Sequence, residues 1–378
     1  MSSHQCKMCN VSLPLAPLLH FSNMPAAAQF LPDAQALAQD QGIDLDIYQC
    51  TACGLVQTAN EPVPYYREVV RAAAFSAEMQ TFRRKQFAEF VQKYALDGKK
   101  LIEIGCGRGE YLALWQESGV AAYGVEYAEQ AVQHCREQGL RVTRGYVDSR
   151  DYALEQAPFD AFAALNFLEH WPDPNASLSG IAHNLSANAI GLVEVPNFDM
   201  ILRNNLFTEF ISDHILYFTR ETLETMLRLN GFEVIACSEI WYGYILSAVV
   251  RKRTACDVSS FDTSRTRLKA NIDDFIRQHG THGVAIWGAG HQALAAIALL
   301  GLAGEISYVV DSAPFKQNRY TPASHIPIVA PEQLHADPVG AIIVMAASYS
   351  DEVVKTIRSV WDNTMHVAIL RDFGLEIV

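Results

Sequence analysis

The sequence lacks an excess of basic residues. Lys and Arg number 29 against 42 Asp and Glu, which gives a formal net charge of −13. An acidic chain repels phosphate backbones, so we expect no nucleic-acid partner. The sequence also lacks an apolar run of about 18 residues, so we expect no membrane span and no membrane partner. The first residues do not have the basic and then apolar pattern of a secretory signal, and we therefore expect a cytoplasmic location.

Charged residues are few, at 19%, whereas hydrophobic residues make up 50% of the chain. This balance is ordinary for a globular protein with a normal core. At roughly 100–200 residues per domain, 378 residues correspond to two or three domains. The sequence shows no tandem repeat and no low-complexity tract. We expect a monomer or weak homo-oligomer that acts on a small molecule.

Short apolar segments alternate with segments of helical spacing, which predicts an α/β fold with doubly wound parallel strands. Strands are expected at 100–104, 121–125, 141–143, 161–165, 190–195 and 247–250, and helices at 66–94, 111–118 and 129–138. A second α/β unit begins near residue 256. It is expected to contain a helix at 264–278 and strands at 284–287, 307–310 and 341–345.

Four of the eight cysteines lie in the first 60 residues, as the pairs Cys6/Cys9 and Cys50/Cys53. Thiols stay reduced in the cytoplasm, so metal binding explains two such pairs better than disulfides do. Four thiolates suit tetrahedral Zn²⁺, and Gly54 favours the turn of the second pair. Four protein ligands leave no open coordination position, so the zinc would be structural. Four buried or redox-active cysteines are the alternative.

A glycine-rich loop follows the strand at 100–104, with glycines at 105, 107 and 109. Glycines allow the backbone to approach a ligand closely. Glu126 ends the next strand, 21 residues after Gly105, where a carboxylate can accept hydrogen bonds from both hydroxyls of a ribose. A nicotinamide dinucleotide is one possible ligand. The tight glycine spacing and the acid at Glu103 favour S-adenosylmethionine instead.

The segment 103–109 resembles the first motif of the class I S-adenosylmethionine-dependent methyltransferases, and the resemblance covers about residues 95–200. It implies a Rossmann-like core, with a loop near the adenine at Gly145 and a segment near the methionine part at Asn166. The residues that it assigns to the cofactor are Glu103, Gly105, Gly107, Glu126, Tyr127, Gly145, Tyr146, Asn166 and Phe167.

The order of the parts resembles a narrower family, the zinc-containing sugar C-methyltransferases of deoxysugar biosynthesis, which act on nucleotide-linked keto-deoxysugars. This resemblance implies three domains. They are a zinc-binding domain at 1–62, a methyltransferase domain at 63–255 and a Rossmann-like substrate-binding domain at 256–378.

The family has an acid–histidine pair before an aromatic stretch, which corresponds here to Asp213, His214 and Tyr217. The resemblance implies that His214 removes the proton next to a ketone to form an enolate, supported by Asp213 and Tyr217. The chain has Ile211 where the family has tyrosine, and Asp213 where it has glutamate. Another donor to the enolate oxygen would be needed, such as Tyr217 or Tyr242. A simple hydrogen-bonding role for His214 in a core turn is the alternative.

A second glycine loop, Gly288–Ala293, and Asp311 fit a dinucleotide-binding pattern. The resemblance implies that this unit binds substrate and holds no redox cofactor. The segment Glu194–Asn197 resembles the family's substrate-side motif, and it fits a strand-ending turn equally well. Two alternatives to sugar C-methylation remain. One is O- or N-methylation of another sugar or small metabolite, and the other is an NAD-dependent oxidoreductase.

Overall fold

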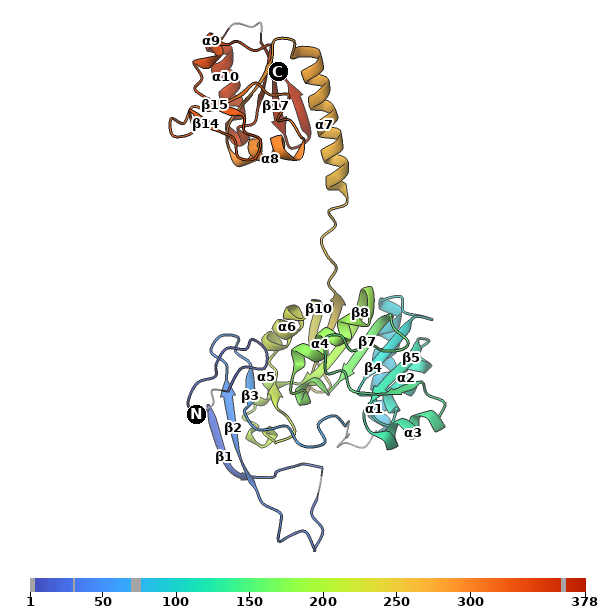
Figure 1. Cartoon of the computed structure of the whole chain (residues 1–378). Coiled ribbons are helices and arrows are strands. Elements are labelled where there is room, and N and C mark those ends of the chain that lie inside the picture. The colour runs from blue at the N-terminus through green and yellow to red at the C-terminus, as the bar shows by residue number, and fades with distance from the viewer. Residues whose placement is uncertain (1–3, 30, 69–75, 362–364) are drawn as a thin grey trace. The chain divides into compact units, whose positions relative to one another are not determined.

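The computed structural model describes residues 4–29, 31–68, 76–361 and 365–378. The chain divides into two compact units, Met1–Ala255 and Cys256–Val378 (Figure 1). Each unit has its own central sheet of seven strands. No helix within the described ranges has both the length and the apolar character needed to cross a membrane.

The first unit is built on a mixed sheet with the strand order β10-β11-β8-β7-β4-β5-β6. The five strands from β8 to β6 are parallel, and β11 and β10 extend the sheet in antiparallel fashion. The strands are β4 (Lys100–Ile104), β5 (Ala121–Glu126), β6 (Val142–Arg144), β7 (Phe159–Leu165), β8 (Leu185–Pro196), β10 (Phe232–Ile240) and β11 (Ile245–Lys252). The α-helices are α1 (Ala77–Lys93), α2 (Glu110–Glu117), α3 (Glu129–Glu137), α4 (Pro174–His183), α5 (Phe198–Arg203) and α6 (Arg220–Leu229), with 3₁₀ turns η1 (Leu168–His170) and η2 (Phe207–Glu209).

The central strands are mostly apolar because both faces of the sheet are buried. Leu101 of β4 packs in one core cluster, and its neighbour Ile102 packs in the other. The predicted strands and the helices at 111–118 and 129–138 are confirmed to within a few residues at their ends. The predicted helix at 66–94 is shorter. Helix α1 begins after the cap Ser76, residues 64–67 form a turn, and 69–75 lie outside the described residues.

A second sheet in the first unit was not predicted. It has the antiparallel order β1-β2-β3-β9, with β1 (Leu19–Met24), β2 (Ile43–Gln49), β3 (Val56–Thr58) and β9 (Leu216–Tyr217). Strand β9 follows the acid–histidine pair of the sequence analysis. The sheet therefore holds the cysteine-containing segment against the loop that carries His214.

The second unit has the strand order β14-β15-β13-β12-β16-β17-β18, with β15 to β17 parallel and antiparallel strands at the two edges. The strands are β12 (Val284–Trp287), β13 (Tyr308–Val310), β14 (Arg319–Tyr320), β15 (Pro327–Val329), β16 (Ala341–Val344), β17 (His366–Arg371) and β18 (Gly374–Ile377). The helices are α7 (Ser260–His279), α8 (His291–Leu299), α9 (Gln333–Ala336), α10 (Ser350–Val360) and the 3₁₀ turn η3 (Ala347–Tyr349). The second α/β unit expected from the sequence is confirmed.

Candidate cofactor and active site

The first glycine loop connects β4 to α2 in a conformation that favours glycine. Gly105, Gly107 and Gly109 have φ angles of 72°, 57° and 85°, which lie in the left-handed region. A Cβ atom on Gly109 would come within 2.4 Å of Leu140 Cδ1 and 3.0 Å of Cys135 Sγ. The residue at 109 must therefore be small for α2 to begin beside α3.

Glu126, at the end of β5, holds this loop in place. The backbone N–H of Gly107 donates to its Oε2 at 2.9 Å, and the N–H of Ala128 donates to its Oε1 at 2.9 Å. These two bonds fix the orientation of the carboxylate beside the loop.

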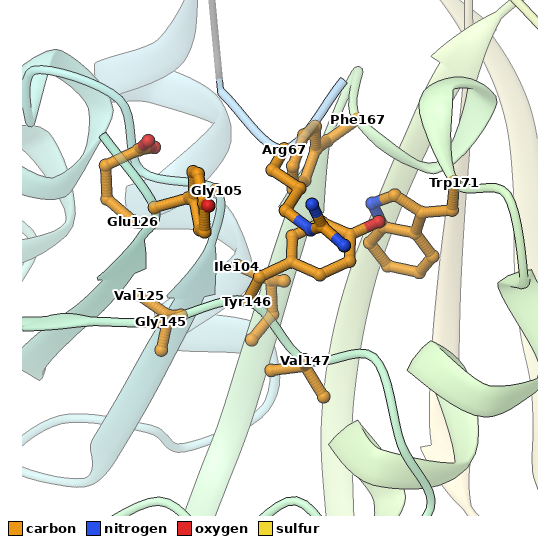
Figure 2. A pocket seen from close by; sticks show the side chains of 11 residues that line it. Arg67, Ile104, Gly105, Val125, Glu126, Gly145, Tyr146, Val147, Phe167 and Trp171 are labelled. Carbon is orange, nitrogen blue, oxygen red and sulfur yellow. The ribbon is translucent and has the colours of Figure 1, made fainter. Parts of the chain in front are cut away.

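A pocket lies in front of the loop (Figure 2). Its lining residues are Arg67, Ile104, Gly105, Val125, Glu126, Tyr127, Gly145, Tyr146, Val147, Phe167 and Trp171. The structure thus brings together six of the nine residues assigned to the cofactor, namely Gly105, Glu126, Tyr127, Gly145, Tyr146 and Phe167. The other three support this wall. Glu103 is fully buried in β4, Gly107 is bound to Glu126, and the N–H of Asn166 donates to Glu194 O at 2.8 Å.

Four of the eleven lining residues are aromatic, and aromatic rings suit an adenosyl group. The ring of Tyr146 lies edge-on to those of Tyr66 and Phe167, and Phe167 lies edge-on to Trp171. The indole N–H of Trp171 is buried and has no hydrogen-bond partner in the described part of the chain. A ligand with an acceptor atom can use this donor. The residues present therefore fit S-adenosylmethionine, and Trp171 and Arg67 are wall residues that the sequence analysis missed.

A cluster of titratable side chains adjoins this pocket. The ring of His170 is 6.4 Å from that of Phe167 and 4.9 Å from that of His214, centre to centre. The imidazoles of both histidines and the carboxyl of Glu169 have polar atoms that all lie within 4.8 Å of one another. His170 Nδ1 donates to the carbonyl oxygen of Asp213 at 2.7 Å, which places the proton of a neutral His170 on Nδ1. Its Nε2 is 3.9 Å from Glu169 Oε1.

Burial sets the protonation states of this cluster. Burial lowers the pKa of His214 to about 3, with a smaller contribution from neighbouring His170. Burial also lowers the pKa of His170 and raises the pKa of Glu169 to about 8. All three groups are therefore predominantly neutral at pH 7. A neutral His214 has a lone pair that can accept a proton, but the low pKa makes it a weak base unless a negative charge forms beside it.

Asp213 fixes the loop that carries His214. Its Oδ2 accepts a hydrogen bond from Tyr65 Oη at 2.6 Å, and its Oδ1 accepts one from the N–H of Ala28 at 2.8 Å. Burial and the bond to Asp213 together raise the pKa of Tyr65 to about 12. Tyr65 was missed from sequence because it lies 148 residues from Asp213 in a Pro-rich segment without regular periodicity. The carboxylate of Asp213 thus binds the N-terminal segment to the active-site loop.

The hydroxyl of Tyr217 is engaged in the same loop. It donates to the carbonyl oxygen of Ile211 and accepts from the N–H of Ile211, both at 3.2 Å. Its ring lies 6.4 Å from that of His214. Tyr242, the other possible enolate donor, is 78% exposed and donates to Glu78 Oε1 at 2.6 Å. In this conformation both hydroxyls are used elsewhere, and Tyr217 supports His214 by closing its loop.

The segment Glu194–Asn197 has a structural explanation. Glu194 is fully buried and pairs with Arg83 of α1, which is 1% exposed. Gln86 Nε2 and Ser247 Oγ donate to the other carboxylate oxygen, and Asn197 Nδ2 donates to Gly243 O. These contacts anchor α1 to β8 and favour the strand-ending turn over the substrate-side motif.

The four N-terminal cysteines converge on one point. Cys6 Sγ lies 3.5 Å from Cys53 Sγ, Cys9 Sγ lies 3.5 Å from Cys50 Sγ, and all four sulfurs lie within 4.8 Å of one another. Tetrahedral Zn²⁺ with Zn–S bonds of ~2.3 Å places sulfurs about 3.8 Å apart. Gly54 has a φ of 77°, as expected for the turn of the second pair. The donor set therefore fits a zinc ion.

The second glycine loop is bound by the acid at the end of the next strand, as the first loop is. Gly288 has a φ of 114°, and the N–H of Ala289 donates to Asp311 Oδ2 at 2.8 Å. The same carboxylate oxygen accepts a bond from Lys316 Nζ at 2.9 Å. Burial alone would raise the pKa of Asp311, but the hydrogen bonds from Lys316 and two backbone N–H groups lower it. A pocket lined by this loop, Lys316 and Tyr349 opens at the carboxyl ends of the parallel strands.

Two family models match separate parts of the chain. Residues 79–236 match the family described as "Methyltransferase domain", and residues 253–369 match the family described as "C-methyltransferase C-terminal domain". The C-methyltransferase NovU of Streptomyces niveus is 24% identical over 95% of this chain and 93% of its own length.

Several relatives match a part of the chain. The ubiquinone biosynthesis O-methyltransferase of Methylococcus capsulatus is 34% identical over 23% of this chain and 39% of its own length. Among solved structures, the PH0226 protein from Pyrococcus horikoshii OT3 matches 50% of this chain and 99% of its own, with 16% identity and a TM-score of 0.41. The domain matches and the named relatives identify the chain as an S-adenosylmethionine-dependent methyltransferase with a class I methyltransferase domain.

Proposed function

We propose that this methyltransferase transfers a methyl group to a carbon atom next to the ketone of a nucleotide-linked keto-deoxysugar, with His214 as the general base. The observation that carries the proposal is the neutral imidazole of His214, connected to the cofactor pocket through ring contacts with His170 and Phe167. The match of the second unit to a C-methyltransferase domain and the similarity to NovU support carbon as the acceptor.

The chemistry explains why a base is needed here. A carbon atom beside a carbonyl becomes nucleophilic only when it loses a proton, and a positioned histidine can accept that proton. His214 Nδ1 or Nε2 takes the proton and becomes an imidazolium, while the electron pair of the C–H bond moves into the enolate. The buried site disfavours an isolated imidazolium, and the negative enolate formed in the same step offsets this cost. When bound, S-adenosylmethionine supplies a sulfonium methyl group that a carbanion can displace.

The loop contacts give His214 a fixed position. Asp213 is bound by Tyr65 and Ala28, and Tyr217 closes on Ile211, so both sides of the His214 loop are tied to the protein. A fixed base contributes through orientation as well as through proton affinity. In the proposed reaction Asp213, Tyr65 and Tyr217 are thus positioning residues.

The second unit is proposed to hold the nucleotide part of the substrate. Lys316 and the N-terminus of α8 offer positive charge at the same pocket, which suits a diphosphate. Asp311 already binds Lys316 and the loop backbone, so it is poorly placed to accept both ribose hydroxyls of NAD. These contacts favour a nucleotide-sugar phosphate over a redox dinucleotide.

The four cysteines are proposed to hold one structural Zn²⁺. The supporting observation is the convergence of four thiols at tetrahedral spacing in a segment whose strand β3 pairs with β9. Such an ion would stabilise the segment that binds Asp213 through Ala28. Metal analysis of the purified protein should find about one equivalent of zinc.

The variant His214→Asn tests the function. With nucleotide-linked keto-deoxysugars as substrates, we expect methylation to fall by about 10²- to 10⁴-fold while binding of S-adenosylhomocysteine is retained. Exchange of the acidic C–H with deuterated water, in the presence of S-adenosylhomocysteine, should be lost in the same variant. Cys256→Ser, at an exposed position in the second unit, is the control. A near wild-type rate of methylation in His214→Asn would refute the base and favour O- or N-methylation, for which orientation alone can suffice.

A further inference from the structure

Arg67 is a charged wall residue of the cofactor pocket that neither the glycine loop nor the catalytic cluster explains. Its guanidinium carbon lies 4.7 Å from the ring centre of Tyr66 and 5.6 Å from those of Tyr127 and Tyr146. Figure 2 shows the side chain over the ring of Tyr146, among the residues that line the pocket with Gly105 and Glu126. The guanidinium is thus a cation held among aromatic rings at the ligand-binding surface.

The position of Arg67 is fixed by its neighbours. It lies in the turn at 64–67, where the N–H of Tyr66 donates to Val63 O at 3.0 Å and the N–H of Glu68 donates to Tyr65 O at 2.8 Å. The Tyr65 hydroxyl is bound to Asp213, and the Tyr66 ring packs edge-on against Tyr146. Both residues before Arg67 are therefore anchored to the core, and they hold the backbone of Arg67 beside the pocket.

We infer that Arg67 is a cofactor-binding residue that contacts the adenosyl group of S-adenosylmethionine. A guanidinium plane supported by aromatic rings can stack on a purine and donate hydrogen bonds to its ring nitrogens or to ribose oxygens. The pocket around it contains Glu126 and Tyr127, the residues at the end of β5 where the ribose of a Rossmann-type ligand binds. The chemistry of Arg67 matches the neutral, acceptor-rich adenosyl group rather than the cationic sulfonium.

The inference concerns the cofactor site alone, so failure of the sugar C-methylation proposal would leave it standing. The adenosyl group is common to the cofactor and to its product. Arg67→Ala should therefore weaken binding of S-adenosylmethionine and S-adenosylhomocysteine by the same factor, about tenfold, as expected for a stacked cation. An interaction that is equally strong with cofactor and with product does not favour the transition state. Its loss therefore raises KM for the cofactor but leaves kcat at saturating cofactor unchanged.

Calorimetric titration tests this with two probes, S-adenosylhomocysteine and 5′-methylthioadenosine, the second of which lacks the amino-acid part. We expect Arg67→Ala to weaken both by the same factor. Arg84→Ala removes an exposed arginine that pairs with Glu117 outside the pocket, and should change neither. Unchanged or tighter binding to Arg67→Ala would overturn the inference, as would a loss confined to S-adenosylhomocysteine.

Arg67→Lys provides a second test in case the alanine variant does not fold. It keeps the charge and the aliphatic stem but loses the plane that stacks, so both probes should bind about threefold more weakly. If Arg67→Ala does not fold, the affinities of Arg67→Lys for the two probes test the inference instead. Wild-type affinity for both probes would then overturn the inference.

Discussion

The buried carboxyl of Glu169 makes the stability of the first unit depend on pH in a defined direction. Glu169 is 1% exposed, its Oε2 has no hydrogen-bond partner among the described residues, and burial raises its pKa from 4.5 to about 8. In the unfolded chain the same group titrates near its ordinary value. Between these two values the folded protein binds a proton that the unfolded chain does not. Its contribution to stability is therefore complete below pH 4.5 and is lost as the pH rises through about 8.

The magnitude follows from the size of the shift. A shift from 4.5 to about 8 corresponds to a loss on the order of 5 kcal/mol across the whole range, at about 1.4 kcal/mol for each pKa unit. Between pH 6 and pH 8 the loss is about 2 kcal/mol, because the group is already half ionised at the upper end. Glu169→Gln removes the titration and keeps the shape. The wild-type protein should therefore lose about 2 kcal/mol relative to this variant over that range.

Urea unfolding at pH 6, 7 and 8 measures the difference, with the fluorescence of Trp115, Trp171 and Trp241 as the probe of the first unit. Trp287→Phe and Trp361→Phe in every sample remove the signals of the second unit. Glu155→Gln, at an exposed position, controls for the loss of one negative charge. A difference that stays constant from pH 6 to pH 8, or that favours the wild type more at high pH, would refute the reasoning.

Three further predictions concern the rest of the fold. Arg83→Met leaves Glu194 buried without its cation and should lower the free energy of unfolding by about 3–5 kcal/mol. The double variant Arg83→Met/Glu194→Gln has no buried charge at this place and should regain part of that stability. An equal loss of stability in the single and the double variant would contradict the ion-pair argument. Gly109→Ala should cost more stability than Gly139→Ala in denaturant unfolding. Both have a positive φ, which costs about 1–2 kcal/mol, but only the first adds a Cβ atom to occupied space. Cys50→Ser should contain well under one equivalent of zinc and melt at a lower temperature, and full zinc occupancy would rule out the four-cysteine site.

Local sequence patterns predicted the central parts of both units because parallel strands are buried on both faces. The segment 100–104 is apolar except for Lys100 and Glu103, and it ends at a glycine loop whose φ angles other residues rarely adopt. Such a pattern is local, so it can be interpreted without knowledge of the rest of the chain. The pocket-wall residue Gly105 was identified in this way, and Glu126 was identified from its place at the end of the next strand, 21 residues further along.

Contacts between distant segments could not be predicted in the same way. The pairing of β3 with β9 joins residues about 160 positions apart and involves only two residues of β9. The partner of Asp213 is Tyr65, in a turn without helical or strand periodicity. The sequence indicated that Tyr217 lies near His214, but it could not show that the hydroxyl closes on Ile211. The residue types were recognisable, and their partners depended on the tertiary fold.

The two glycine loops of this chain are held by the same kind of hydrogen bonds but have different cations near them. In each unit an acid at the end of the second strand accepts one N–H from the glycine loop and another from two residues further along the chain, as Glu126 and Asp311 do. Asp311 also binds Lys316 through the same carboxylate. Arg67 lines the pocket of Glu126 and lies among aromatic rings. The shared hydrogen bonds thus fix the two loops, and among the described residues the two units differ in how a cation is held beside the loop, by a carboxylate in one and by aromatic rings in the other.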